Sequence, residues 1–181
     1  MRKLLNDELG RKTKEEFHKA KKNSVIIVLD DVRSMNNVGS VFRTADAFLI
    51  EAIHLCGFTP VPPHREIQKT ALGATETVTW KHYESAAQSL AELKQNGWKV
   101  YAIEQAENSI SLSDFHPAEN EKIALIFGNE VEGVKQELIN ESDGVIEIPQ
   151  HGMKHSLNIA VSAGIVMWEI TNKLQHYTIT S

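Results

Sequence analysis

Three short blocks hold the side chains best suited to chemistry. The first contains Asn37 and, six residues later, Arg43; the second is Gly128-Asn129-Glu130, and the third is Ser156-Leu157-Asn158. A guanidinium carries five N–H donors and stays protonated under ordinary conditions, so Arg43 suits a phosphate or a developing negative charge. The spacing of Asn37 and Arg43 is nearly two helical turns, within reach of one ligand if the start of the helix is loosened.

The elements predicted around these blocks alternate between strand and helix. Apolar runs predict strands at 25–29, 52–55, 77–80, 98–103, 123–127 and 145–148. Helical spacing of apolar residues predicts helices at 38–48, 86–93, 134–139 and 156–174. The alternation indicates an α/β fold with a mostly parallel sheet covered on both faces. Ligands in such sheets bind at the carboxyl ends of strands, where Glu104, Gly128 and Pro149 fall.

Local signals refine these elements. Asn36 or Asn37 is expected to cap the helix that carries Arg43. Three prolines at 60, 62 and 63 predict a loop that leads into residues 70–74. Small and apolar residues along the final helix would bury a face against the same chain or against a second subunit, and the pattern does not separate the two.

Composition bounds the class of protein. With 181 residues, 41% hydrophobic and 24% charged, the chain fits one globular domain. No stretch approaches the roughly 18 uninterrupted apolar residues of a membrane helix, and the first residues turn polar too soon for a secretory signal. The single cysteine, Cys56, has apolar neighbours and is expected to be buried strand filler. We therefore expect a cytoplasmic protein with no membrane contact.

Charge is unevenly distributed. The chain carries −5, but residues 1–22 hold eight Lys or Arg against four Asp or Glu, a net of +4, which leaves −9 on the rest. A basic arm on an acidic body can serve as a footprint for phosphates. The alternative is a charged helix, over residues 6–22, that packs on the sheet through Leu9, Phe17 and Ala20.

The three blocks, in this order, resemble the signature motifs of the SpoU, or TrmH-like, RNA ribose 2′-O-methyltransferases of the SPOUT superfamily. The resemblance runs from about Val25 to Trp168. It implies a SPOUT-type α/β knot, in which residues 123–170 thread back on themselves as a deep C-terminal trefoil knot. It also implies a homodimer, because the family assembles its active site where two subunits meet. The chain then divides into a basic N-terminal helical arm (1–22) and a SPOUT methyltransferase domain (23–181).

The resemblance also implies a cofactor, S-adenosyl-L-methionine, cradled by the bends of the knot. Gly128, Ile148 and Leu157 match the family's cofactor-contacting positions. Ile103 is a weaker match, because Glu104-Gln105 replaces the small polar continuation of the family. Backbone donors and acceptors with apolar walls suit a neutral adenine.

Five residues match the family's catalytic positions, listed along the chain as Asn37, Arg43, Glu130, Ser156 and Asn158. The family mechanism has the arginine assist deprotonation of the ribose hydroxyl; phosphate anchoring and stabilisation of the developing alkoxide is the physically safer role for Arg43. Two simpler alternatives remain open. Arg43 would pair with Asp46 three residues on, and Ser156 would only cap the final helix.

The interpretation that follows is an S-adenosylmethionine-dependent ribose 2′-O-methyltransferase acting on tRNA or rRNA. A short basic arm in place of a separate RNA-binding domain favours tRNA. A catalytically silent RNA-binding or assembly module on the same fold is the alternative, although Arg43, Glu130 and Asn158 are all retained. A dinucleotide-dependent oxidoreductase would need Gly-x-Gly-x-x-Gly where residues 30–33 read Asp-Asp-Val-Arg. No metal is expected, because His151 and His155 have no third ligand at suggestive spacing.

Overall fold

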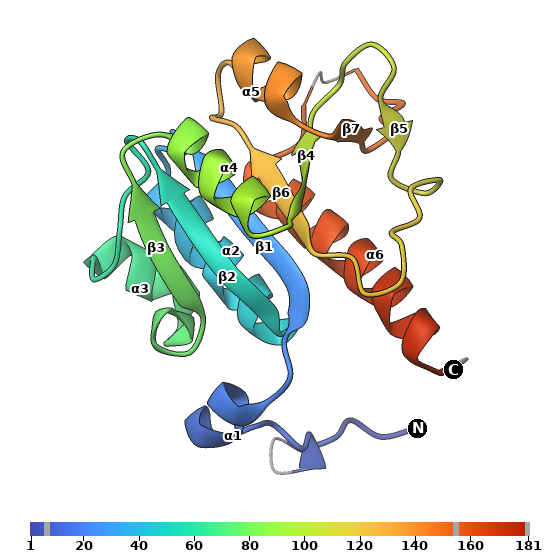
Figure 1. The fold of residues 1–181 in the computed structure, drawn as a ribbon. Coiled ribbons are helices and arrows are strands. Elements are labelled where there is room, and N and C mark those ends of the chain that lie inside the picture. Colours follow the sequence, from blue (N-terminus) through green and yellow to red (C-terminus); the bar gives the residue numbers. More distant parts are fainter. Residues whose placement is uncertain (6–7, 154–155, 180–181) are drawn as a thin grey trace.

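The computed structural model describes residues 1–5, 8–153 and 156–179, with side chains as far as Leu174. Its centre is one seven-stranded sheet in which every pairing is parallel (Figure 1). The strands are β1 (Asn23–Asp30), β2 (Ile50–Cys56), β3 (Thr79–Tyr83), β4 (Lys99–Ile103), β5 (Ile110–Ser111), β6 (Ile123–Phe127) and β7 (Gly144–Glu147). Their order across the sheet is β3-β2-β1-β6-β4-β7-β5.

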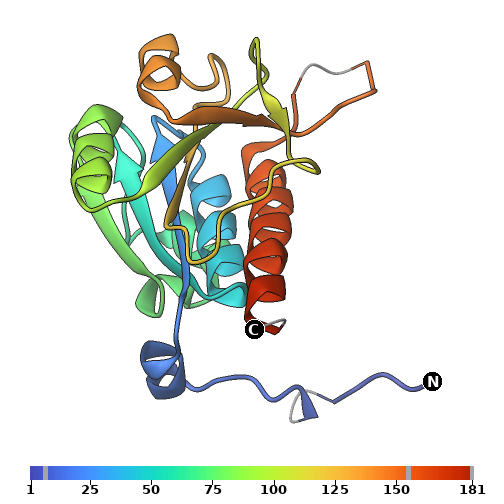
Figure 2. The same ribbon diagram turned by 45° about the vertical axis from the view of Figure 1, so that its right-hand side comes forward.

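The described residues also form six α-helices, namely α1 (Lys14–Lys19), α2 (Met35–Ala47), α3 (Arg65–Ala71), α4 (Ala86–Gln95), α5 (Gln136–Glu141) and α6 (Ile159–Ile179). A short 3₁₀ turn, Ala74–Glu76, follows α3. Val25, Ile27 and Leu29 of β1 pack with α2, α3 and α6 on one face. Ile26 and Val28 pack with α4 and α5 on the other (Figures 1 and 2). The expected α/β class and parallel sheet are confirmed; the trefoil knot stays a prediction.

Helix α2 begins earlier than expected. Its cap is Ser34, whose hydroxyl accepts the N–H of Asn37 at 3.3 Å, so the prediction of a cap at Asn36 or Asn37 is wrong. Extended backbone at Ser34 ends the preceding loop and puts Asn37 inside the first turn. The amide of Asn37 is thereby free for contacts outside the helix.

Two short elements were not expected from the sequence. Helix α3 occupies Arg65–Ala71, where a loop was predicted, and its close packing on α2 depends on Gly39. A Cβ at Gly39 would lie 2.3 Å from the carbonyl oxygen of Ile67. Strand β5 is only two residues long and pairs with β7 at the edge of the sheet.

The N-terminal arm is less helical than predicted. Its α-helix covers only Lys14–Lys19, and residues 6–7 of the expected helix lie outside the described residues. Phe17 is buried, 5% exposed, whereas Leu9 is 42% exposed and does not pack as expected. The arm is thus anchored through the ring of Phe17 and through an ion pair between Lys14 and Glu76. Within the described part of the chain, no helix is long and apolar enough to cross a membrane.

Candidate active site

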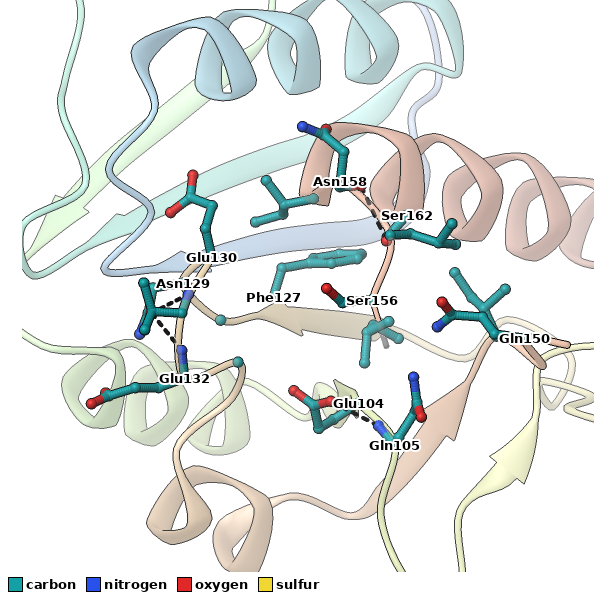
Figure 3. Close-up of a pocket in the computed structure, with 17 residues that line it drawn as sticks. Glu104, Gln105, Phe127, Asn129, Glu130, Glu132, Gln150, Ser156, Asn158 and Ser162 are labelled. Atoms are coloured by element: carbon teal, nitrogen blue, oxygen red, sulfur yellow. Dashed lines mark hydrogen bonds between the residues drawn. The ribbon is translucent and has the colours of Figure 1, made fainter. Parts of the chain in front are cut away.

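A pocket of about 520 Å³ lies where β4, β6 and β7 end and α6 begins (Figure 3). Ile103, Gly128, Ile148 and Leu157 all line it. These are the four positions expected to hold a cofactor, and they come from segments separated by up to 54 residues (157 − 103). The structure therefore brings the predicted cofactor residues together at the carboxyl edge of the sheet.

The loop after β6 forms one wall and is tightly folded. Asn129 accepts the backbone N–H groups of Val131 and Glu132 through Oδ1, both at 2.9 Å. A Cβ at Gly128 would lie 1.8 Å from the carbonyl oxygen of Gly133, so only glycine allows this approach. Gly128 is thus required by the turn itself, and the turn shapes the pocket.

Glu104 holds the far end of the same loop. Its Oε2 accepts the N–H of Val134 at 3.0 Å, and its Oε1 accepts the N–H of Gln105 at 2.9 Å. Gly133 has a φ of +70°, and a Cβ there would lie 2.1 Å from Glu104 Oε2. The sequence placed Glu104 at the ligand-binding edge of the sheet and marked it as a departure from the family pattern after Ile103. The structure shows that the departure supplies a strut between β4 and the pocket loop.

Glu130 lies on the pocket loop (Figure 3), and its carboxylate contacts the start of α2. It accepts the backbone N–H groups of Arg33 (3.2 Å) and Ser34 (3.3 Å). It also accepts the side-chain amide of Asn37 at 3.1 Å. Partial burial alone would raise the pKa of Glu130, but these donors, together with its own backbone N–H, lower it below the ordinary value. Glu130 is therefore held as a carboxylate.

Asn158 joins this network from α6. Its Nδ2 donates to Asn37 Oδ1 at 3.2 Å, while its Oδ1 accepts the N–H of Ala160 at 2.9 Å. Asn158 thus caps α6, which begins at Ile159, and the alternative that Ser156 caps this helix is wrong. Ser156 lies two residues upstream and lines the pocket.

Arg43 lies apart from the other four predicted catalytic residues. It is exposed on α2, does not line the pocket, and makes no hydrogen bond or ion pair with any residue the structure describes. The alternative pairing with Asp46 does not form, since Asp46 accepts the hydroxyl of Thr77 at 2.5 Å instead. A loosened helix start is also absent at Asn37, which sits in regular α-helix.

The pocket is acidic. Glu104, Glu130 and Glu132 contribute carboxylates to its lining, and no Lys or Arg lines it among the described residues. This charge favours a ligand with a cationic group. The described residues contain no group of three His, Cys, Asp or Glu side chains able to hold a metal ion; His155 lies outside them.

Comparison with known proteins points to one family. The sequence pattern of the SpoU rRNA Methylase family matches residues 24–168. A tRNA/rRNA methyltransferase of Borreliella burgdorferi is 32% identical over 88% of this chain and 68% of its own length. The 23S rRNA (guanosine-2′-O-)-methyltransferase RlmB of Ralstonia nicotianae is 32% identical over 80% of this chain, which spans only 57% of that relative.

Solved structures agree on the fold. The TrmH/SpoU tRNA modifying enzyme of A. aeolicus superimposes with a TM-score of 0.79, at 24% identity, over 91% of this chain and 82% of its own. The AdoMet-bound rRNA methyltransferase of Sinorhizobium meliloti gives a TM-score of 0.78 at 26% identity, over 87% of this chain and 60% of its own. With the family pattern matched over most of its length, the chain belongs to the SpoU rRNA methylase family of methyltransferases.

Proposed function

We propose that this protein transfers a methyl group from S-adenosylmethionine to a ribose 2′-hydroxyl of RNA. The observation that carries the proposal is the hydrogen-bonded chain Glu130–Asn37–Asn158, which joins all three sequence blocks at the rim of one pocket. Such a chain fixes polar groups before a substrate arrives, and preorganised groups supply much of the rate in transfer reactions.

The pocket fits S-adenosylmethionine on three counts. Its volume lies within the usual range for small-molecule sites. Its bends at Gly128 and Gly133 expose backbone groups, and Ile103, Ile148 and Leu157 supply apolar walls. Its carboxylates suit a sulfonium, which supplies an activated methyl group when the cofactor is bound. The cofactor would be held by Gly128 together with Ile103, Ile148 and Leu157.

The polar residues outside the cofactor site have separate roles in binding the RNA and in catalysis. Glu130 has a lowered pKa and four donors, so we assign it to positioning Asn37 rather than to accepting a proton. Asn37 and Asn158 orient the ribose through their amides. Ser156 contacts the substrate from the approach to α6. Arg43 anchors the RNA phosphate and stabilises the developing alkoxide.

Arg43 can fulfil that role if two copies of the chain combine. An apolar stripe of Val161, Ile165 and Trp168 is exposed on α6, at 51%, 38% and 56% respectively. Spacings of four and three residues place the stripe on one helix face. We propose a homodimer that buries this stripe and lets Arg43 reach the pocket of the other subunit. The trefoil knot expected of the family belongs to the same proposal.

The RNA is proposed to be tRNA rather than rRNA. A tRNA (guanosine(18)-2′-O)-methyltransferase of Borreliella burgdorferi matches 98% of this chain and 79% of its own length, at 25% identity. A structure described as methylating C/U34 on tRNA is matched over 97% of its chain, with a TM-score of 0.75 and 27% identity.

The direct test is transfer of labelled methyl from S-adenosylmethionine to fractionated tRNA and rRNA, followed by identification of the nucleoside. We expect a 2′-O-methylated nucleoside in the tRNA fraction. Label on a base would contradict ribose chemistry, and label in rRNA alone would contradict the tRNA assignment. Binding of S-adenosylhomocysteine and RNA without any transfer would favour the silent RNA-binding module.

A mixing experiment tests the dimeric site. Arg43→Ala lacks the anchor, and Gly133→Val should distort the pocket loop, because a Cβ there meets Glu104. If Arg43 acts in the other subunit, an equal mixture of the two inactive variants should recover about a quarter of wild-type activity, since half the dimers are mixed and each holds one intact site. No recovery, once subunit exchange is verified, would place Arg43 in its own subunit.

A further inference from the structure

Phe58 stands on the turn that follows β2, at the same edge of the sheet as the pocket. Its side chain is 84% exposed and makes no ring contact with another described residue. One exposed apolar side chain is ordinary on a protein surface. What is unusual about Phe58 is the rigidity of its support.

The turn that carries Phe58 is fixed at several points. The N–H of Phe58 donates to Asp31 Oδ1 at 2.8 Å, and the N–H of Gly57 donates to the carbonyl of Tyr83 at 3.0 Å. The buried hydroxyl of Thr59 donates to the carbonyl of Leu29 and accepts the N–H of Val32, both at 3.0 Å. The ring is therefore presented with little backbone freedom left to lose on binding.

Asp31, which carries the turn, is itself locked. Its Oδ2 accepts Lys135 Nζ at 2.7 Å, and Lys135 follows directly on the pocket loop. Burial would raise the pKa of Asp31, but Lys135 and the N–H of Phe58 lower it, so the carboxylate stays charged. Lys135 also lies 3.5 Å from the buried Asp30. Lys135 thus offsets one of the two carboxylate charges, so the pair does not repel a polyanion with its full charge.

Arg33 lies beside this turn and connects it to the pocket. Its backbone N–H donates to Glu130, which lines the pocket. Its guanidinium is exposed and makes no hydrogen bond or ion pair with the residues described. An aromatic face and an available guanidinium on adjacent segments are the groups that single-stranded RNA uses for base stacking and phosphate binding.

We propose that Phe58 is a stacking platform for an unpaired base of the substrate RNA, with Arg33 on a neighbouring phosphate. This inference rests on the proposed function, because it assigns the RNA to the same edge of the sheet as the methyl-transfer pocket. The substrate class that it implies is a single-stranded loop rather than a helix, because only unstacked bases can lie on an aromatic ring.

The test is to measure, by fluorescence anisotropy, the affinity of the full chain for a short single-stranded RNA. Phe58→Ala and Phe58→Leu should each weaken binding roughly tenfold or more, while Phe58→Trp keeps it, because stacking needs a flat ring. Val61→Ala, which trims another exposed side chain of the same loop, should change little. A Phe58→Leu variant that binds as well as the wild type would overturn stacking in favour of a general apolar contact.

Two further readouts address the base and the phosphate. Phe58→Trp should gain emission that RNA quenches beyond the wild-type background, and an abasic ribose-phosphate oligomer should not quench it. Absence of extra quenching would overturn the proposal. Arg33→Ala should lower the slope of log affinity against log salt by roughly 0.7, whereas the matched Arg65→Ala on α3 should not.

Failure of this inference can be told from failure of the proposed function. Wild-type protein that shows the stacking pattern yet transfers no methyl group would overturn the function and leave the platform standing. Methyl transfer that is unaffected by Phe58→Ala at limiting RNA would overturn the platform and leave the function standing. Loss of S-adenosylhomocysteine binding in Phe58→Ala would show damage to the fold, and the quenching assay would then decide.

Discussion

The rim of the pocket and the outer faces of α2 and α6 differ in whether their side chains have partners within the chain. At the rim of the pocket, Glu130, Asn37 and Asn158 satisfy one another through hydrogen bonds of 3.1–3.2 Å within one chain. On the outer faces, Arg43 has no partner among the described residues, and Trp168 is 56% exposed. Folding of one chain thus satisfies the polar groups at the rim, whereas it leaves the side chains of Arg43 and Trp168 exposed on the outer faces.

The outer faces of α2 and α6 lie next to each other. Helices α2 and α6 pack closely, with Thr44 Cγ2 3.9 Å from where a Cβ at Gly164 would lie. The rings of Phe48 and Trp168 are 5.8 Å apart. A second subunit that covers the stripe on α6 would therefore come close to α2 and Arg43. In the proposed homodimer, the cofactor would therefore bind within one chain, whereas catalysis would require two.

The largest effect is expected at Arg43. Arg43→Ala should lower methyl transfer by about 10²-fold or more, because it removes charge stabilisation at the reacting oxygen. Affinity for S-adenosylhomocysteine should stay nearly unchanged, since Arg43 does not line the pocket. Single-turnover kinetics and calorimetry measure the two quantities. Arg65→Ala is the matched control, and a variant of Arg43 that keeps more than about a tenth of wild-type turnover would refute the catalytic role.

A second substitution tests the exposed apolar stripe on α6. Trp168→Glu places a charge in the apolar stripe and should convert a dimer to monomers in sedimentation, with methyl transfer falling about tenfold or more as the shared site disappears. Cofactor affinity should change much less. Leu72→Glu, at another exposed apolar position (65%), should leave the oligomeric state as it was. A dimer that survives the Trp168 change would move the interface elsewhere.

Much of the fold could be predicted from the sequence, because burial on both faces of a parallel sheet leaves continuous apolar runs such as Ile123–Phe127. Helix α3 escaped prediction because the prolines before it signalled a loop and its seven residues give little periodicity. Ser34 escaped as a cap because two asparagines beside it compete for the same role.

The residues of the site could be predicted from the sequence, but the contacts between them could not. Gly128 and Leu157 fall in motif blocks, so the pocket could be foreseen once the resemblance was seen. The contacts that join the blocks could not, because Glu130, Asn37 and Asn158 meet only through tertiary packing. Glu104 was noticed as a mismatch, but its partner, the N–H of Val134, is 30 residues away.

Glu104 offers a test of how far the pocket loop is preorganised. Glu104→Ala removes the acceptor for the Val134 N–H and should weaken S-adenosylhomocysteine binding about tenfold, or about 1.4 kcal/mol. Glu104→Gln keeps an acceptor of the same reach and should recover most of the affinity. Glu132→Ala removes another pocket carboxylate outside the strut. If calorimetry showed equal losses for Glu104→Ala and Glu132→Ala, negative charge rather than loop support would be the cause.

The smallest effect on methyl transfer is expected from the arm, which also combines a buried residue with an exposed segment. Phe17 is buried and Lys22 lies over its ring at 3.3 Å, so Phe17→Ala should lower the melting temperature, with a stability loss of about 3 kcal/mol. Residues 1–12 carry four Lys or Arg against two Asp or Glu, and the described ones among them are exposed.

Deleting residues 1–12 should therefore leave the melting temperature nearly unchanged, because Thr13, which caps α1, is kept. It should flatten the salt dependence of RNA binding, with the slope falling by roughly 0.7 for each phosphate that the arm no longer neutralises. Arg2 already pairs with Glu8 at 2.6 Å, which leaves Lys3, Arg11 and Lys12 as the candidate phosphate ligands. An unchanged salt slope together with a lower melting temperature would mean that the arm serves packing alone. Measuring both quantities on the deletion and on Phe17→Ala separates the two roles, because each variant should move only one of them.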